Sequence, residues 1–359
     1  MICLDVRTTA VSFVDDFYID QDGKTPLYIA SQNGYDEVVR HLLDAGANFN
    51  YRSPDGWTPL YNASYYGHEK IVKCLLEAGA DIDQAGNGDA TPLHAASYKG
   101  HEAVVALLLA AGASLDIGKH TGATALHFSS QMGHLAIVQR LVAAGVNVNR
   151  ANNNGVTALY TASRNGHDSI VMCLLDAGAN INQCNENGRT ALYEASYCGH
   201  DRVVQCLLDG CADIEQSTNG GETPLYAASS QGHDTIVRLL LSAGATVDSR
   251  QGDGETPLFV ACLSGHAAIV KQLLAAGANI DQPTDNGSTP LGIASEMDNE
   301  SVVVCLLEAS ASINQRNAGG RTPLYNASYN GNDKIVRHLI EAGAVVNLTD
   351  NSSLYLPAS

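Results

Sequence analysis

Threonine recurs at one fixed interval through almost the whole chain, and no other feature of the sequence constrains the fold as strongly. It stands every 33 residues, at positions 25, 58, 91, 124, 157, 190, 223, 256, 289 and 322. A period of this length is the signature of stacked supersecondary units rather than of one closed hydrophobic core. The sequence therefore predicts an elongated solenoid of ten repeats, in which each repeat packs only on its neighbours.

The second copy shows what one repeat contains. Thr58 followed by proline predicts the start of a helix, because threonine caps free N–H groups and proline has the φ of a first helical turn. This helix is expected over residues 59–66 and ends at Gly67, which can adopt a positive φ. A second helix with a wide apolar face is expected over 69–78. Gly79 ends it, and a glycine-rich, hairpin-like finger follows.

These motifs resemble the ankyrin repeat. The second copy reads Thr58-Pro59-Leu60-Tyr61, then Gly67-His68 and Gly79-Ala80, and about nine tenths of the chain follows this pattern. The resemblance implies an all-α repeat solenoid in which each repeat is a helix-turn-helix with a β-hairpin finger, stacked into a curved, elongated body. We place ten repeats at residues 21–348. Residues 1–20 form an irregular N-terminal cap or lead, and residues 349–359 a degenerate or truncated eleventh repeat.

The net negative charge of the chain argues against polyanionic partners. Part of this charge has a structural cause. There are 20 basic and 38 acidic side chains, a net charge of −18, which repels nucleic acid and anionic lipid. Many acidic residues fall in the first turn of the expected second helix, where they complement the helix dipole. They are Asp36, Glu69, Glu102, Asp168, Asp201, Asp234, Glu300 and Asp333. No apolar run reaches the roughly 20 residues that a membrane-spanning helix needs.

The nine cysteines follow the repeat register rather than a disulfide pattern. Four of them, at 74, 173, 206 and 305, occupy one equivalent position. Equivalent positions in a stack lie about 10 Å apart, which is too far for a disulfide. Reduced thiols are typical of the cytoplasm and nucleus, and residues 1–20 do not have the pattern of a signal peptide. We therefore expect a cytoplasmic or nuclear protein.

The histidines do not indicate a metal or catalytic site. Seven of the twelve stand ten residues after the repeat threonine, at 68, 101, 134, 167, 200, 233 and 266. Stacking spaces such residues about 10 Å apart, whereas zinc ligands lie about 2 Å from one ion. The family resemblance implies that these histidines hydrogen-bond the finger and the adjoining repeat. The glycine-rich turns lack the strand-turn-helix context of a phosphate-binding loop. We expect no enzyme activity, no cofactor and no bound metal.

Function is expected where the copies differ from one another. In the ankyrin family the binding surface is the concave side, which corresponds here to the residue before each repeat threonine and those seven and eight after it. The candidate protein-binding residues are Trp57, Tyr65, Tyr66, Tyr98, Lys99, Met132, Arg164, Arg189, Tyr197, Arg321 and Tyr329. Tryptophan, tyrosine and arginine most often dominate interface energies. The alternative is that the rings only cover the first helix against its neighbour. Tyr61 and the other tyrosines in the usual histidine slot are interpreted as structural.

The sequence thus predicts a monomeric, non-catalytic interaction module that binds a partner protein. The alternative is the recognition arm of a larger effector, such as an enzyme, a channel subunit or a ubiquitin-ligase adaptor, of which this chain is a fragment. Repeat-like residues near the end of the chain, 353–359, suggest that alternative. A stand-alone enzyme is the third class, with His120, the only histidine outside the repeat register, as its candidate residue.

Overall fold

The computed structural model describes residues 19–347. The expected N-terminal cap, apart from its last two residues, and the expected eleventh repeat therefore lie outside the described residues. Within that range the chain forms twenty α-helices, a short 3₁₀ turn at Asn87–Asp89 (η1) and no β-strand. None of these helices has the length and apolarity that a membrane crossing requires. The all-α repeat solenoid that the period predicts is confirmed.

Within the described residues the helices belong to two compact units, residues 19–162 with Ser169–Asn180 and Ser163–Asp168 with residues 181–347. Unit 1 has helix pairs α1 (Pro26–Asn33) and α2 (Asp36–Asp44), α3 (Pro59–Tyr66) and α4 (Glu69–Glu77), α5 (Pro92–Lys99) and α6 (Glu102–Ala110), and α7 (Ala125–Met132) and α8 (Leu135–Ala143). At its boundary with unit 2 lie α9 (Ala158–Arg164) and α10 (Asp168–Asp176).

Unit 2 continues the same pairing. Its helices are α11 (Ala191–Cys198) and α12 (Asp201–Asp209), α13 (Pro224–Gln231) and α14 (Asp234–Ser242), α15 (Pro257–Ser264) and α16 (Ala267–Ala275), α17 (Pro290–Glu296) and α18 (Glu300–Glu308), and α19 (Pro323–Asn330) and α20 (Asp333–Glu341).

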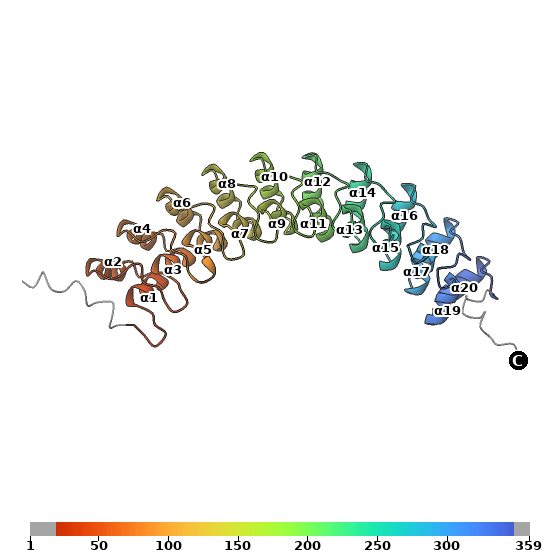
Figure 1. Ribbon diagram of the computed structural model, residues 1–359, viewed down its shortest axis with the longest axis horizontal. Coiled ribbons are helices and arrows are strands. Elements are labelled where there is room, and N and C mark those ends of the chain that lie inside the picture. The colour runs from red at the N-terminus through yellow and green to blue at the C-terminus, as the bar shows by residue number, and fades with distance from the viewer. Residues whose placement is uncertain (1–18, 348–359) are drawn as a thin grey trace, which may run out of the picture. The chain divides into compact units, whose positions relative to one another are not determined.

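Within each unit the first helices of the repeats form one row and the second helices another (Figure 1). In unit 1, for example, α3 packs on α1 and α5, and α4 packs on α2 and α6. The core lies between the two rows. Ile71, Val72 and Leu75 of α4 are completely buried there, and each such side chain contributes about 1.5–3 kcal/mol to stability.

The predicted start and stop signals act as expected. Thr58 Oγ1 accepts a hydrogen bond from the Tyr61 N–H at 3.1 Å, and Gly67 ends α3 with φ 78°. The first helix of this repeat has the predicted bounds, and the second ends one residue early, at Glu77. Where a helix-ending glycine is replaced, the left-handed conformation persists, with φ 61° at Cys211 and 68° at Ser310.

The expected fingers are turns, each joined to the next repeat. At the finger between the second and third repeats, two backbone hydrogen bonds close the turn, from the Gly86 N–H to the Ala90 carbonyl at 2.9 Å and from the Asp89 N–H to the Gly86 carbonyl at 3.1 Å. A finger side chain also accepts a hydrogen bond from a backbone N–H 31 residues further on, as Asn50 does from Asp81 at 2.9 Å. The acceptors are Asn50, Asp83, Asp116, Asn149, Asn182, Glu215, Asp248, Asp281 and Asn314. Part of the acidity of the chain therefore links neighbouring repeats.

The in-register histidines bond the preceding repeat, as the structural interpretation requires. His68 Nε2 lies 3.0 Å from the Gln32 carbonyl oxygen, and equivalent bonds form in other repeats. In the ninth repeat Asn299 replaces histidine, and its Nδ2 donates to the Leu263 carbonyl at 3.0 Å. The side chain at this position thus satisfies a carbonyl group at the end of the preceding first helix.

Candidate functional site

A column of stacked aromatic rings lies on the second repeat. Trp57 precedes α3, and Tyr61 and Tyr65 follow at intervals of four residues, so the three side chains share one face. The ring centroids of Trp57 and Tyr61 are 4.0 Å apart, and those of Tyr61 and Tyr65 are 6.3 Å apart. Tyr66 lies beside the column, edge-on to Tyr65, and is 46% exposed.

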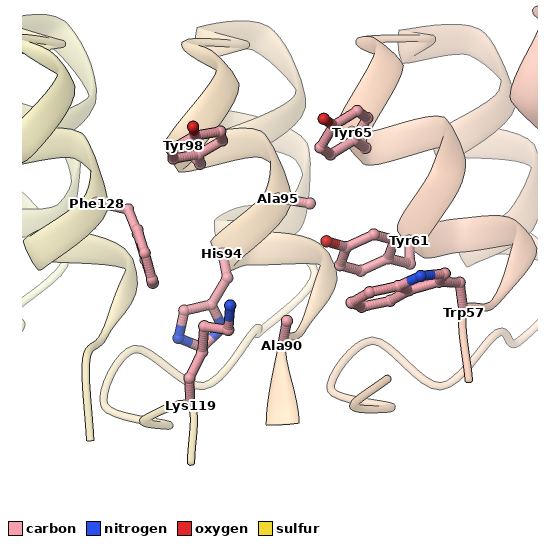
Figure 2. Close-up of a pocket in the computed structure, with 9 residues that line it drawn as sticks. All are labelled: Trp57, Tyr61, Tyr65, Ala90, His94, Ala95, Tyr98, Lys119 and Phe128. Carbon is pink, nitrogen blue, oxygen red and sulfur yellow. The ribbon is translucent and has the colours of Figure 1, made fainter. Parts of the chain in front are cut away.

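A pocket of about 220 Å³ lies between this column and the next two repeats (Figure 2). On its other side Tyr98 of α5 and Phe128 of α7 have ring centroids 6.1 Å apart, and Lys119 reaches in from the loop before α7. The hollow depends on two small residues of the third repeat. Ala90 stands where the second repeat has its tryptophan, and Ala95 where the fourth repeat has Phe128. Larger side chains at these two positions would fill the pocket.

Two lysine ammonium groups lie close to the rings. Lys99 Nζ is 4.5 Å from the ring centroid of Tyr65 and 5.6 Å from that of Tyr98. Lys119 Nζ is 5.4 Å from the centroid of Phe128. A hydrogen bond to Tyr65 raises the pKa of Lys99. Neither lysine forms an ion pair with any carboxylate between residues 19 and 347.

Tyr61 and His94 of the pocket are neutral near pH 7. Burial raises the pKa of Tyr61 to about 12, with neighbouring tyrosines adding to the effect. Burial also lowers the pKa of His94 to about 4. The Thr91 N–H donates to His94 Nδ1 at 3.1 Å, so the proton is on Nε2, which donates to the Ala123 carbonyl at 3.2 Å. Both ring nitrogens are engaged, and His94 therefore has no nitrogen left to act as a base.

Five of the eleven candidate binding residues meet at this pocket. Trp57, Tyr65 and Tyr98 line it, and Tyr66 and Lys99 lie beside it. The rings do cover first helices, as the alternative interpretation held, but they also enclose a hollow. The covering role of the rings is thus observed, and their binding role stays a prediction.

In unit 2, the candidates Arg164 and Arg189 flank a carboxylate that the sequence analysis missed. Glu194 of α11 is only 2% exposed; its Oε1 is 3.2 Å from Arg189 Nη1, and its Oε2 is 3.9 Å from Arg164 Nε. The Arg189 guanidinium also lies over Tyr193 and Tyr197, at 5.2 and 6.0 Å from their centroids. A signal was present in the sequence, because this position carries a charged residue in no other repeat.

The tenth repeat has the same arrangement of arginine and tyrosines. The Arg321 guanidinium is 5.5 Å from the ring centroid of Tyr325 and 5.9 Å from that of Tyr329, which is 74% exposed. We call each set of one arginine over two tyrosine rings an arginine–tyrosine column. Met132, at the end of α7, is exposed and belongs neither to the pocket nor to such a column. The eleven candidates thus divide into three clusters and one separate side chain.

Besides Ala90 and Ala95, four residues of the pocket were not among the candidates: Tyr61, His94, Lys119 and Phe128. Tyr61 and His94 occupy the slot interpreted as structural; they do pack within the repeat, but they also line the pocket, so that interpretation was incomplete. Signals for the other two exist in the sequence. Lys119 is the only basic residue, and Phe128 the only aromatic one, at its position among the ten repeats.

The part of the chain that the structure describes contains no group of three histidine, cysteine or carboxylate side chains arranged to hold a metal ion. Eight cysteines there are free thiols. His120, the only histidine outside the repeat register, is exposed, and its Nδ1 lies 3.2 Å from the Gly88 carbonyl oxygen of the preceding finger. It therefore joins two fingers.

Comparisons with known proteins agree with the repeat architecture. A family model described as ankyrin repeats (three copies) matches overlapping stretches at residues 8–86, 48–119, 83–152, 136–218, 159–251, 203–284, 247–317 and 278–350. The crystal structure of the human ASB11 ankyrin repeat domain superimposes with a TM-score of 0.56 at 30% sequence identity, covering 60% of this chain and 96% of that one. A sequence comparison with curated proteins gives no match.

Proposed function

Since the chain belongs to the ankyrin repeat family, whose repeats are generally protein-interaction modules, we propose that it binds a partner protein through its first helices and fingers and has no catalytic activity of its own. In this family these elements form the concave surface. The observation that carries the proposal is the aromatic pocket of the second to fourth repeats. We also propose a monomer that acts in the cytoplasm without a cofactor.

The composition of the pocket supports a binding role. Tyr66 and Tyr98 are 46% and 39% exposed, and Trp57 and Tyr65 are half-buried. Clustered aromatic surface is expensive to leave in water and commonly marks an interaction site. Buried aromatic anchors in a well-packed pocket are the residues whose truncation costs a protein interface about 2 kcal/mol or more each.

The arginine–tyrosine columns of unit 2 are proposed as further contact points. Arg189 is held between Glu194, which its Nη1 contacts at 3.2 Å, and the ring of Tyr197, and Arg164 lies 3.9 Å from the same carboxylate. An arginine held in this way loses little conformational freedom when it binds a partner, so it is well suited to an interface. Arg321, Tyr329 and Met132 complete the proposed set.

The test compares the wild-type chain with a variant that combines Trp57→Ala, Tyr65→Ala, Tyr66→Ala and Tyr98→Ala. Each protein is immobilised, exposed to cell lysate, and its captured proteins are quantified by mass spectrometry. A cost of about 2 kcal/mol for a single anchor already corresponds to about thirtyfold weaker binding, so we expect the specific partner to be lost.

Tyr35→Ala is the matched control, because Tyr35 is 56% exposed but lies outside the clusters. Circular dichroism should show equal helicity for all three proteins. Capture of the same proteins in equal amount by wild type and the combined variant would show that the pocket is not the binding site.

A further inference from the structure

We propose that the pocket takes one aromatic or long aliphatic side chain of the partner, from a segment that carries carboxylates next to that side chain. This inference rests on the proposed function and specifies the chemistry of the partner at the same site. It is argued from the size of the pocket, its walls and the charges around it.

The size of the pocket fits a side chain rather than a whole ligand. Its volume of about 220 Å³ is below the roughly 300–1,000 Å³ of sites that enclose drug-sized molecules. Its walls are mostly aromatic, and its base is formed by Ala90 and Ala95. Interfaces commonly seat a single anchor residue in such a hollow, and an apolar anchor would stack on the ring faces that are already there.

The charged groups at the pocket are hydrogen-bond donors. Both nitrogens of His94 are engaged within the chain. Burial keeps the Tyr61 hydroxyl protonated far above pH 7. The remaining charges are the ammonium groups of Lys99 and Lys119, next to the rings of Tyr65 and Phe128. A group that complements these donors is an acceptor with negative charge.

Among the described residues, several other lysines form ion pairs with carboxylates, whereas Lys99 and Lys119 do not. Lys70 Nζ lies 3.3 Å from Asp36 and Lys334 Nζ 3.1 Å from Glu300. The chain has 18 more acidic than basic side chains, yet neither pocket lysine meets a carboxylate in the range 19–347. An acidic segment would supply the missing partners. A cationic anchor, such as a methylated lysine, is disfavoured because the two ammonium groups already lie over ring faces and would repel it.

The experiment selects peptides from a random phage-displayed library on the immobilised full chain. Binding of the enriched peptides is then measured by the fluorescence of Trp57. It is the only tryptophan in the chain and lines the pocket, so its emission reports occupancy directly. We expect the peptides to share an aromatic or long aliphatic residue next to aspartate or glutamate.

Three variants keep this reporter. Tyr98→Ala removes a wall of the pocket and should abolish binding. Lys99→Glu combined with Lys119→Glu should weaken binding at least about tenfold, and raised salt should weaken the wild type too. Lys271→Glu, an exposed lysine of α16 in unit 2, is the control and should leave affinity unchanged. Circular dichroism and urea unfolding establish that each variant is folded.

The outcomes separate this inference from the proposed function. If peptides need Tyr98 but bind the lysine-reversed variant equally well, the acidic partner is wrong and the pocket remains the proposed binding site. If enriched peptides change neither Trp57 emission nor affinity in Tyr98→Ala, both proposals about the pocket are overturned. The inference is also overturned if the selection enriches basic peptides or yields no binding peptide. The capture of proteins from lysate tests the proposed function separately.

Discussion

Acidification should weaken unit 1 through one buried imidazole, that of His94. In six other repeats the same position holds tyrosine, at residues 28, 61, 160, 193, 226 and 325. His94→Tyr is therefore a change that the architecture already accommodates elsewhere. It removes the titrating group and keeps an aromatic ring at the site.

The size of the effect follows from the environment of His94. Burial lowers its pKa from 6.5 to about 4, with Lys119 adding to the shift and the Ala123 carbonyl opposing it. A group whose pKa is lower in the folded state contributes stability that is present above about pH 6.5 and is lost as the pH falls towards 4. The full effect is about 3 kcal/mol, and most of it, about 2 kcal/mol, is lost between about pH 7 and pH 4.5.

Urea unfolding followed by Trp57 fluorescence measures this loss, because Trp57 is in the repeat before His94 in the same unit. The free energy of unfolding is compared between wild type and His94→Tyr at both pH values. Carboxylates and His127, whose pKa burial also lowers, titrate in both proteins and cancel in the difference. We expect the wild type to lose about 2 kcal/mol more than the variant. Equal losses would refute the assignment of this stability to His94.

Three further changes test other parts of the structure. Tyr61 should titrate near its pKa of about 12, so alkaline absorbance should show a phenolate forming near pH 12 that Tyr61→Phe removes; stability should fall as the pH rises from about 10 to 12. Arg189→Ala leaves the buried Glu194 with only Arg164, 3.9 Å away, and should cost about 2 kcal/mol in thermal unfolding. Adding Glu194→Ala should restore most of that loss, and no recovery would contradict the ion-pair explanation. Ser310→Gly should stabilise the ninth repeat by about 0.5–1 kcal/mol, seen as slower hydrogen exchange, because serine holds φ 68° there; unchanged exchange would count against strain at this residue.

The helices could be predicted from the sequence because their ends depend on local groups. Thr58 caps the first turn of α3, and Gly67 ends it with a positive φ. These contacts span only a few residues, so the order of residues along the chain contains them. The same holds for the acidic first turns of the second helices, such as Glu69 in α4. Ten copies in one register then required only that neighbouring repeats stack in the same way.

The pocket could be predicted only in part, because stacking between three repeats creates it. Trp57 and Tyr98 were expected at an exposed surface, but the hollow between them depends on the small side chain of Ala90. Lys119 reaches this hollow from the loop before α7. Comparing copies shows which positions vary, whereas distances across repeats are set by how the helices pack.

Glu194 illustrates the same division. Its identity is unusual for its position in the repeat, and this is visible in the sequence alone. Its burial and its bonds to Arg189 and Arg164 depend on the packing of α11 against the residues around it. The sequence by itself thus determined the repeats and their helices, since these follow from local hydrogen bonding and periodicity. Only the tertiary structure decided which variable side chains meet, because a buried contact depends on the space that all its neighbours leave.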